Sequence, residues 1–331
     1  MLRAASIGLG WWSDELAGAV QGKSDRLKIV SCYSRSQDRR NVFAKKFGTG
    51  QHETFDGVLA DPQLDAVILS TPHSLHAEHV TRAALAGKHV FVEKPFTLTA
   101  ESGRRAAAAC AAAGVVLAVG QNRRFSAVGQ ILKTMLEAGD FGTILHLESN
   151  FSVPSALGYT ADRWRANRIE SPAGGLAGLG VHMIDLMCWL AGPVAGVSAQ
   201  AKRRAVSVDM DDTTSALFEF ASGPTGYLGT SMACPNTSFL NLYGTKANAF
   251  AQVDANELKL QKAGGQATAC EVVPVETLKA ELEEFAAACA GGPAFRVRPE
   301  EAIHNVAVME AITASAARGM APVMLDAPAE K

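Results

Sequence analysis

The sequence of 331 residues lacks the cysteine patterns of disulfide-rich and zinc-binding proteins. Its six cysteines are scattered, and they form neither a CxxC pair nor a set with histidines at zinc-finger spacing. Scattered thiols are typical of proteins from a reducing compartment. We therefore expect no metal site.

Charge of one sign and long apolar runs are also missing. The formal net charge is −2, with acids and bases interspersed, so nucleic acid and anionic membranes are not expected partners. No apolar run reaches the length of a membrane-spanning helix, and Met1 leads into a strand-like segment without the basic and apolar regions of a secretory signal. We expect a cytoplasmic protein whose partner is a small polar molecule.

Apolar strand-like segments alternate with helical segments in the first part of the chain. The strand-like segments are 2–9, 27–33, 65–69, 89–92 and 115–119, and the main helical ones are 13–20, 37–47, 75–86 and 99–113. Continuous apolar strands between helices predict a parallel sheet covered on both faces, which is a doubly wound α/β domain.

The pattern changes after residue 121. A helix to about residue 138 and a long alternating strand at 143–153 come first, and strand-like segments with Gly, Pro and Asn between them fill 194–273. This pattern predicts a mostly antiparallel sheet. Helices are expected at 174–190, 277–290 and 299–318. We therefore predict two domains, 1–121 and 122–331.

A glycine turn follows the first strand. Gly8 and Gly10 would allow a tight turn and let the backbone approach a dinucleotide pyrophosphate at a helix N-terminus, with Trp11 and Trp12 beside it. Ser13 stands where the third glycine of the fingerprint is usual. An ordinary turn from strand to helix is the alternative.

The end of the second strand bears on the choice of cofactor. An acidic residue there would bind a ribose 2′-hydroxyl, but the sequence has Ser34 and Arg35, with Arg39 beyond them. Arginines at this place favour the 2′-phosphate of NADP over NAD. A solvated basic helix face is the alternative.

Polar residues also follow the later strands. Ser70, Thr71 and Pro72 end the third strand, where open α/β sheets bind ligands, and His73 and His76 would line the cofactor site or cap the next helix.

Lys94 follows a buried strand that ends in Glu93, and burial or a neighbouring cation would suit a lysine to acid/base chemistry. A surface lysine is the alternative. We expect Gln121, which follows the last strand of the first domain, to bind the cofactor together with Glu93 and Lys94.

His182 and Asp185 lie one turn apart on a predicted helix that follows a glycine-rich approach. The Asp185 carboxylate would orient the imidazole of His182, which makes both candidates for catalysis, with His182 also touching the substrate. A core histidine bonded to a backbone carbonyl is the alternative.

Four further residues are candidates for substrate binding. Arg123, Arg124, Trp164 and Arg165 suggest a polar or anionic ligand with a flat part, because arginine binds carboxylate or phosphate and tryptophan stacks on rings. They would otherwise bind cofactor phosphates or hold their loop in place.

These residues together resemble the Gfo/Idh/MocA family of oxidoreductases over almost the full length. The resemblance rests on the Gly8 turn, the Ser70–Pro72 segment with His76, the Glu93-Lys94-Pro95 element, Arg123-Arg124-Phe125 and the segment 180–185. It implies a Rossmann domain, a second α/β domain with a large, mostly antiparallel open sheet, and a substrate cleft between the domains. It also implies association into homodimers or homotetramers through that sheet.

The resemblance implies hydride transfer between nicotinamide C4 and a hydroxyl or carbonyl carbon of a sugar, sugar acid or cyclitol. His182 would be the general acid/base and Lys94 would assist it. Gly178 stands where the family often has an aspartate. This departure leaves open a non-catalytic dinucleotide sensor, or a reductase of an imine or an unsaturated ring.

Overall fold

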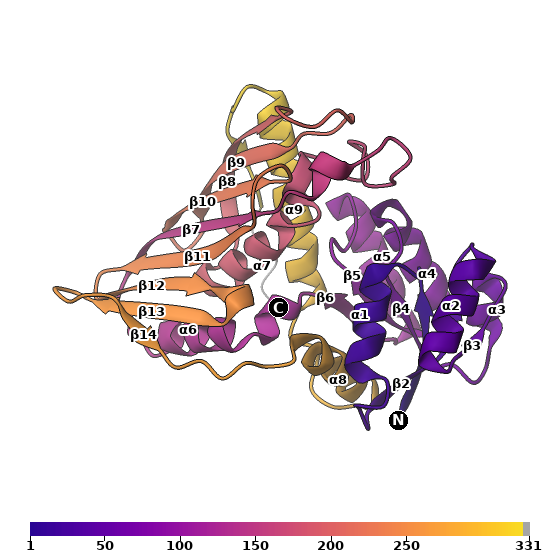
Figure 1. Cartoon of the computed structure of the whole chain (residues 1–331). Helices are drawn as coiled ribbons and strands as arrows, with labels where there is room; N and C mark the ends of the chain where they lie inside the picture. The colour runs from indigo at the N-terminus through magenta and orange to yellow at the C-terminus, as the bar shows by residue number, and fades with distance from the viewer. Residues whose placement is uncertain (327–331) are drawn as a thin grey trace. The chain divides into compact units, whose positions relative to one another are not determined.

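The computed structural model describes residues 1–326, which form two compact units (Figure 1). The first unit comprises Met1–Asn122 and Glu276–Ile303. The second comprises Arg123–Val275 and the segment that begins at His304. Each unit is thus assembled from two separate stretches of sequence.

Sheet A of the first unit has six parallel strands in the order β3-β2-β1-β4-β5-β6. The strands are β1 (Leu2–Ile7), β2 (Leu27–Tyr33), β3 (Gly50–Gln51), β4 (Ala66–Leu69), β5 (His89–Glu93) and β6 (Leu117–Gly120). This is the strand order of a doubly wound sheet, whose ligands bind at the carboxyl ends of the strands.

The helices of the first unit have distinct start and stop signals. They are α1 (Trp11–Val20), α2 (Gln37–Phe47), α3 (Phe55–Ala60), η1 (His73–Leu75), α4 (His76–Leu85), α5 (Ala100–Ala113) and α8 (Thr277–Cys289). The hydroxyls of Ser36 and Thr99 accept backbone N–H bonds at the starts of α2 and α5, and both helices end at a left-handed glycine, Gly48 or Gly114.

Helix α8 packs against sheet A and α1. The Phe285 ring on α8 lies 5.8 Å from the Phe91 ring on β5, and Phe295 lies 6.5 Å from the same ring. The sequence-based division put these residues in the domain 122–331, whereas 276–303 groups with the first unit. The reason is that this segment buries its aromatic residues on β5.

Sheet B of the second unit has nine strands in the order β14-β13-β12-β11-β7-β10-β9-β8-β15. They are β7 (Ile144–Ser152), β8 (Val194–Lys202), β9 (Thr213–Phe220), β10 (Thr225–Ser231), β11 (Thr237–Gly244), β12 (Ala247–Gln252), β13 (Glu257–Lys262), β14 (Thr268–Cys270) and β15 (Val323–Met324). β7 and β10 pair in parallel, and the other described pairs are antiparallel.

Helix α7 is the central helix on sheet B (Figure 1), and it contacts β7 and β10. α7 spans Gly180–Ala191. The helical segments not yet named are η2 (Asn122–Phe125), α6 (Ala127–Glu137), η3 (Ser155–Gly158), η4 (Gly174–Leu176), η5 (Val253–Ala255) and α9 (Pro299–Ala317). Met183, Leu186 and Met187 of α7 are fully buried. Burial on this scale fixes α7 rigidly to the sheet.

The predicted fold class is confirmed: a doubly wound parallel sheet is joined to a unit with a large, mostly antiparallel sheet. The parallel β7–β10 pair was not predicted, because strand periodicity carries no information about the direction of the partner strand. The two-residue strand β3 and the short helix α3 were also missed.

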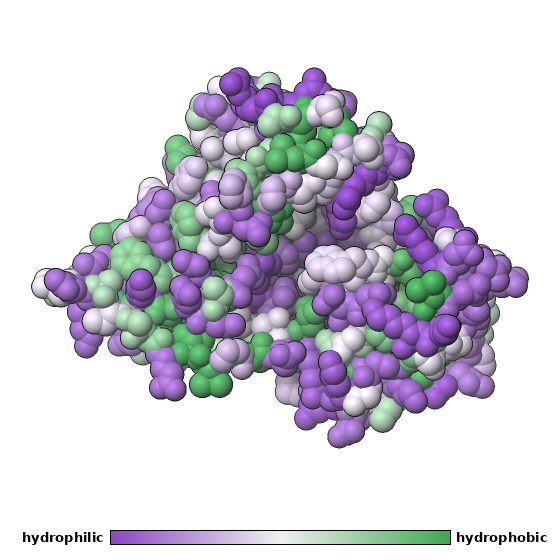
Figure 2. Space-filling view, in the orientation of Figure 1, coloured by the Kyte–Doolittle hydropathy of each residue, from purple (hydrophilic) through white to green (hydrophobic). Residues whose placement is uncertain are grey.

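In residues 1–326, no helix is both long and apolar enough to cross a membrane. Hydrophilic residues predominate on the visible face over α2 and α3 (Figure 2).

Candidate functional site

The carboxyl ends of the sheet A strands bring most of the predicted cofactor-binding residues to one edge. Neighbouring strands of the order β2-β1-β4-β5-β6 end directly before the following residues: Ser34, Gly8, Ser70, Lys94 and Gln121. Parallel strands end on the same edge, so residues from five separate segments become neighbours.

The two glycines of the first turn differ in their surroundings. Gly8 has φ +88°, and a Cβ there would lie 2.7 Å from the carbonyl oxygen of Ser70. A Cβ on Gly10, at the N-cap of α1, would meet nothing within 4 Å. Gly8 is therefore needed for packing, whereas Gly10 leaves open space at a helix N-terminus. This space suits a pyrophosphate.

Ser13 and the two tryptophans complete the turn. The Ser13 hydroxyl is buried and donates a 2.7 Å hydrogen bond to the Gly10 carbonyl oxygen, so it fits where a glycine is usual. The rings of Trp11 and Trp12 lie 5.3 Å apart, and Trp11 is 73% exposed. An exposed indole at this helix start is available to a ligand.

The arginines after β2 divide into two groups. Arg40 is buried, and its Nη1 donates to the carbonyl oxygens of Ser34 and Arg35, which holds the turn. Arg35 and Arg39 are exposed, and within residues 1–326 neither forms an ion pair. Their charges are therefore available to an anionic group.

The segment after β4 is tied to its surroundings through histidines. In His76, Nδ1 lies 2.9 Å from the Pro95 carbonyl oxygen and Nε2 lies 2.9 Å from the Thr71 carbonyl oxygen. His76 therefore joins the Ser70–Pro72 turn to the Lys94-Pro95 loop. The buried His73 ring lies 5.9 Å from it.

Thr71 has a second partner that the sequence analysis missed. Its Oγ1 lies 3.2 Å from Nδ1 of His79, and burial lowers the pKa of His79 to about 4. The imidazole of His79 is thus neutral at physiological pH, and its contact with Thr71 holds the Ser70–Pro72 turn without adding charge.

Glu93 and Lys94 end β5 in different environments. Glu93 is buried and accepts a 3.2 Å hydrogen bond from the backbone N–H of Lys94, while Lys94 is half-buried and its peptide bond to Pro95 is cis. Gly120 makes room for Glu93, because a Cβ there would lie 2.9 Å from Glu93 Oε1. The next residue, Gln121, is also buried.

Glu281 is a further buried carboxyl group that the sequence analysis did not single out. Burial raises its pKa well above the usual value, and the charge of Glu93 raises it further. Glu281 lies one turn before Phe285 on α8, and Glu93 lies two residues after Phe91 on β5. Each acid is thus close in sequence to one ring of the Phe91–Phe285 contact. The sequence does hold a signal for Glu281, because an acid on the apolar face of a helix such as α8 is unusual.

The two arginines after β6 begin the second unit, and both pair with acids of that same unit. Arg124 is 1% exposed and binds Asp185 through Nε and Nη2 at 2.8 and 2.7 Å, and Asn305 donates to the same carboxylate at 2.7 Å. Arg123 binds Asp254 at 2.8 Å. These contacts place Asp185 in an ion pair that anchors α7.

His182 lies near the amino end of α7, buried against β7. The ring centroids of His182 and Phe151 lie 6.1 Å apart, and the guanidinium of Arg123 lies 4.4 Å from the ring centroid of Phe151. The structure thus brings His182 and Arg123 together around Phe151.

The glycines before α7 serve mainly to pack the chain. A Cβ on Gly174 would lie 2.1 Å from the Asp211 carbonyl oxygen, and one on Gly175 would lie 2.6 Å from Thr230 Oγ1. A Cβ on Gly178 would meet nothing within 4 Å. Packing against Asp211 and Thr230 thus explains Gly174 and Gly175, whereas Gly178 has room for a side chain.

Trp164 and Arg165 lie in the loop before η4. The Arg165 guanidinium lies 4.1 Å from the Trp164 ring centroid, and Arg168 of the same loop binds Asp209 and Asp211 at 3.2 and 2.6 Å. These ion pairs fasten the loop to the segment that precedes β9.

Comparison with known proteins adds the family. Residues 2–121 match the model of the oxidoreductase family with an NAD-binding Rossmann fold, and residues 130–250 match the model of the GFO/IDH/MocA C-terminal domain. The chain belongs to this family. It is an NAD(P)-dependent oxidoreductase with sugar and cyclitol dehydrogenases among its relatives, which confirms the resemblance seen in the sequence.

Two relatives align over nearly their whole length. D-xylose 1-dehydrogenase (NADP(+)) 2 of Haloferax volcanii is 29% identical over 92% of this chain and 93% of its own. scyllo-Inositol 2-dehydrogenase (NAD(+)) of Bacillus subtilis is 28% identical over 98% of this chain and 96% of its own. An uncharacterized oxidoreductase of Schizosaccharomyces pombe is 32% identical, but the chain spans only 44% of its length.

The fold has a similar solved structure. A protein of Desulfitobacterium hafniense, assigned as an NADPH-dependent oxidoreductase, superposes with a TM-score of 0.92 at 31% identity, covering 98% of this chain and 97% of its own.

Proposed function

We propose that the protein transfers a hydride between nicotinamide C4 of NAD(P) and a hydroxyl or carbonyl carbon of a sugar, cyclitol or related polar molecule. The observation that carries this proposal is the alignment of nearly the whole chain with a D-xylose and a scyllo-inositol dehydrogenase. Relatives with a named activity are dehydrogenases or reductases, so the comparisons give no support to a non-catalytic sensor.

The residues at the carboxyl edge of sheet A fit a dinucleotide. Gly10 leaves open space at the N-terminus of α1, Trp11 is exposed beside it, and Ser70–Pro72 and Gln121 end neighbouring strands. The nicotinamide ring would supply the hydride acceptor or donor. The protein's part is to hold the cofactor and to move the proton.

In this proposal His182 takes the proton from the substrate hydroxyl as it is oxidised and returns it in the reverse direction. Lys94 assists by donating hydrogen bonds to the same oxygen, which stabilises developing negative charge. Asp185 acts as a positioning residue, since its oxygens hold Arg124 and Asn305 and so fix the helix that carries His182.

The test is turnover of a panel of sugars and cyclitols with both cofactors. Lys94→Ala and His182→Ala should each lower kcat by about 100-fold or more while cofactor affinity changes little, because general acid/base groups contribute about 10²–10⁴-fold. Lys23→Ala, at an exposed lysine after α1, is the control. Absence of turnover across hydroxy and keto compounds would refute the proposal.

For the cofactor, we propose a preference for NADP over NAD. Support comes from Arg35 and Arg39, which are exposed directly after β2, and from the lack of an acid at the end of that strand. Arg35→Ala should weaken NADPH binding about 10-fold and leave NADH binding unchanged, because a charged hydrogen bond contributes about 1.5–3 kcal/mol. Arg104→Ala, exposed on α5, is the control. Equal wild-type affinities for NADH and NADPH would refute the preference.

We also propose a homodimer or homotetramer formed through sheet B. The face of the sheet opposite α7 carries the half-buried aromatic side chains of Tyr227, Phe239, Tyr243 and Phe250. Aromatic surface that is partly open to solvent is typical of protein interfaces.

A further inference from the structure

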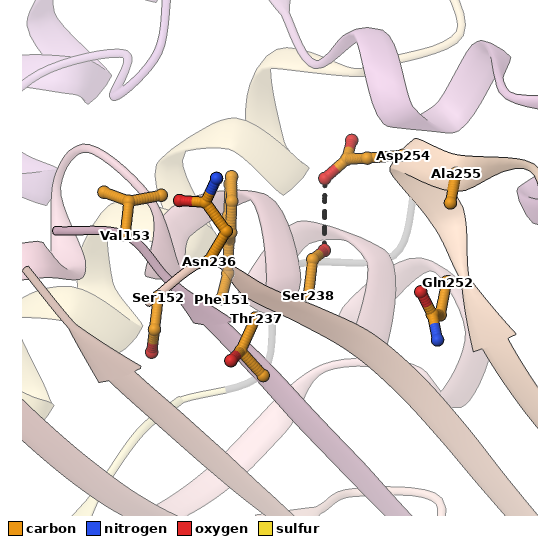
Figure 3. A pocket seen from close by; sticks show the side chains of 9 residues that line it. All are labelled: Phe151, Ser152, Val153, Asn236, Thr237, Ser238, Gln252, Asp254 and Ala255. Atoms are coloured by element: carbon orange, nitrogen blue, oxygen red, sulfur yellow. Dashed lines mark hydrogen bonds between the residues drawn. The ribbon is translucent and has the colours of Figure 1, made fainter. Parts of the chain in front are cut away.

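A cavity of about 330 Å³ opens at the end of sheet B where β7 stops, β11 begins and β12 runs into η5. Phe151, Asn236, Ser238, Gln252 and Asp254 contribute to its lining (Figure 3). The volume is in the range of sites for small ligands. No part of it was singled out from the sequence.

Asp254 is only partly engaged by the protein. Its Oδ2 accepts hydrogen bonds from Arg123 Nη2 at 2.8 Å and from Ser238 Oγ at 3.1 Å, the latter drawn in Figure 3. Its Oδ1 accepts none from any residue in 1–326, and the side chain is 42% exposed. The carboxylate therefore has an oriented acceptor left for a ligand hydroxyl.

The rest of the lining suits the same kind of ligand. Asn236 and Gln252 place exposed amide groups around the cavity, and neither side-chain amide hydrogen-bonds to another residue in the part of the chain that the structure describes. Phe151 adds an apolar surface. An apolar wall with a few convergent polar groups is the usual make-up of a site that orients a small polar ligand.

The cavity is adjacent to the proposed acid/base. Phe151, which lines it, has its ring 6.1 Å from the ring of His182. His182 and the cavity therefore have Phe151 as a common neighbour.

The local charges oppose an anionic ligand. Arg123 is neutralised by Asp254, Arg124 by Asp185, and Arg168 by Asp209 and Asp211. Arg123 and Arg124, two of the three arginines that suggested a carboxylate or phosphate from the sequence, thus already have acidic partners. The open oxygen of Asp254 would repel an anion in the cavity.

We propose that this cavity binds the hydroxyl groups of a neutral sugar or cyclitol away from its reacting carbon, with Asp254 and Ser238 as the residues that select it. The inference rests on the proposed function for the reacting end, and it narrows the substrate to neutral polyhydroxylated compounds.

The experiment measures binding by calorimetry to the full chain saturated with reduced cofactor, so that hydroxyl compounds bind without turning over. The probes are D-glucose, D-xylose and myo-inositol as neutral compounds, and D-gluconate and D-glucose 6-phosphate as anions. The variants are Asp254→Asn and Ser238→Ala. Asp140→Asn is the matched control, since it changes an exposed aspartate before the other end of β7.

At least one neutral probe should bind more tightly than either anion. Asp254→Asn should weaken that probe by at least about 10-fold, as expected for a lost hydrogen bond to a charged group. The same variant should strengthen binding of D-gluconate, because it removes the repelling charge and frees Arg123. A general structural defect would weaken both classes, and Ser238→Ala should weaken only the neutral probe.

The outcomes separate the two proposals. Turnover of a neutral sugar with affinities unchanged in Asp254→Asn and Ser238→Ala would overturn the inference and leave the proposed function standing. If Asp254→Asn weakens the neutral probe and strengthens D-gluconate but no hydride transfer is found with any compound, the inference stands and the proposed function is overturned. Tighter wild-type binding of an anion than of every neutral probe would also overturn the inference.

Discussion

At the scale of the residue, Glu281 places a carboxyl group in the apolar interface between α8 and sheet A. It is fully buried, and both its burial and the charge of Glu93 raise its pKa well above the usual value. A raised native pKa means that the folded protein keeps a proton that the unfolded chain releases above about pH 4.5.

The stability of the protein should therefore fall as the pH rises from about 4.5 toward the native pKa of Glu281. One retained proton gives a slope of up to about −1.4 kcal/mol per pH unit. Glu281→Gln removes this contribution, so the advantage of the variant over the wild type should grow with pH. Denaturant unfolding between pH 5 and 8 measures it.

Glu53→Gln, at an exposed site of the same unit, is the matched control and should parallel the wild type. If the free energies of unfolding of Glu281→Gln and the wild type change in parallel with pH, the pKa of Glu281 is not raised by folding.

At the scale of the element, the approach to α7 contains glycines of two kinds. Gly175→Ala should cost about 1–3 kcal/mol, because the new Cβ would lie 2.6 Å from Thr230 Oγ1 and overpack the contact with β10. Gly178→Ala should be neutral or stabilising by up to about 1 kcal/mol, since its Cβ meets nothing within 4 Å and the unfolded chain loses freedom.

Thermal or urea unfolding of the two variants compares the same substitution at sites three residues apart. Equal losses of stability would mean that the turn, and not the contact with β10, requires glycine.

The sequence predicted most elements of sheet A and its helices within one or two residues, because their boundaries are set by local signals. The helix expected at 174–190, by contrast, begins at Gly180. α2 was expected at 37–47 and spans Gln37–Phe47, with its start at the Ser36 cap and its end at Gly48. The positions of Gly8, Lys94 and His182 on their elements followed from the same local patterns.

What the sequence did not predict depends on which element packs on which. The periodicity of α8 marks an apolar face but not the sheet that covers it, so its grouping with the first unit was missed. Likewise, Arg124 and Asp185 are far apart in sequence, and only the fold shows that they neutralise each other. The cavity near Asp254 is formed by three strand ends, and no local motif marks it.

At the scale of the whole molecule, the proposed association through sheet B is open to a direct test. Phe250→Glu should weaken the oligomer by about 30-fold or more, as for loss of an aromatic contact of at least about 2 kcal/mol. Leu85→Glu, at a 77% exposed residue ending α4, is the control. Sedimentation equilibrium gives the mass of each form. An unchanged assembly in Phe250→Glu would exclude this face.

The split sequence of the first unit has a consequence for synthesis. Roughly 150 residues separate Asn122 from Glu276, which at bacterial or eukaryotic translation rates take on the order of 10–30 s to make. During that time Phe91 has neither Phe285 nor Phe295 to cover it, and the apolar surface of sheet A that α8 will cover stays open on the ribosome. We therefore expect the nascent chain to bind chaperones that recognise apolar surface until its last sixth emerges, and we expect an amino-terminal fragment ending at residue 122 to keep this surface exposed.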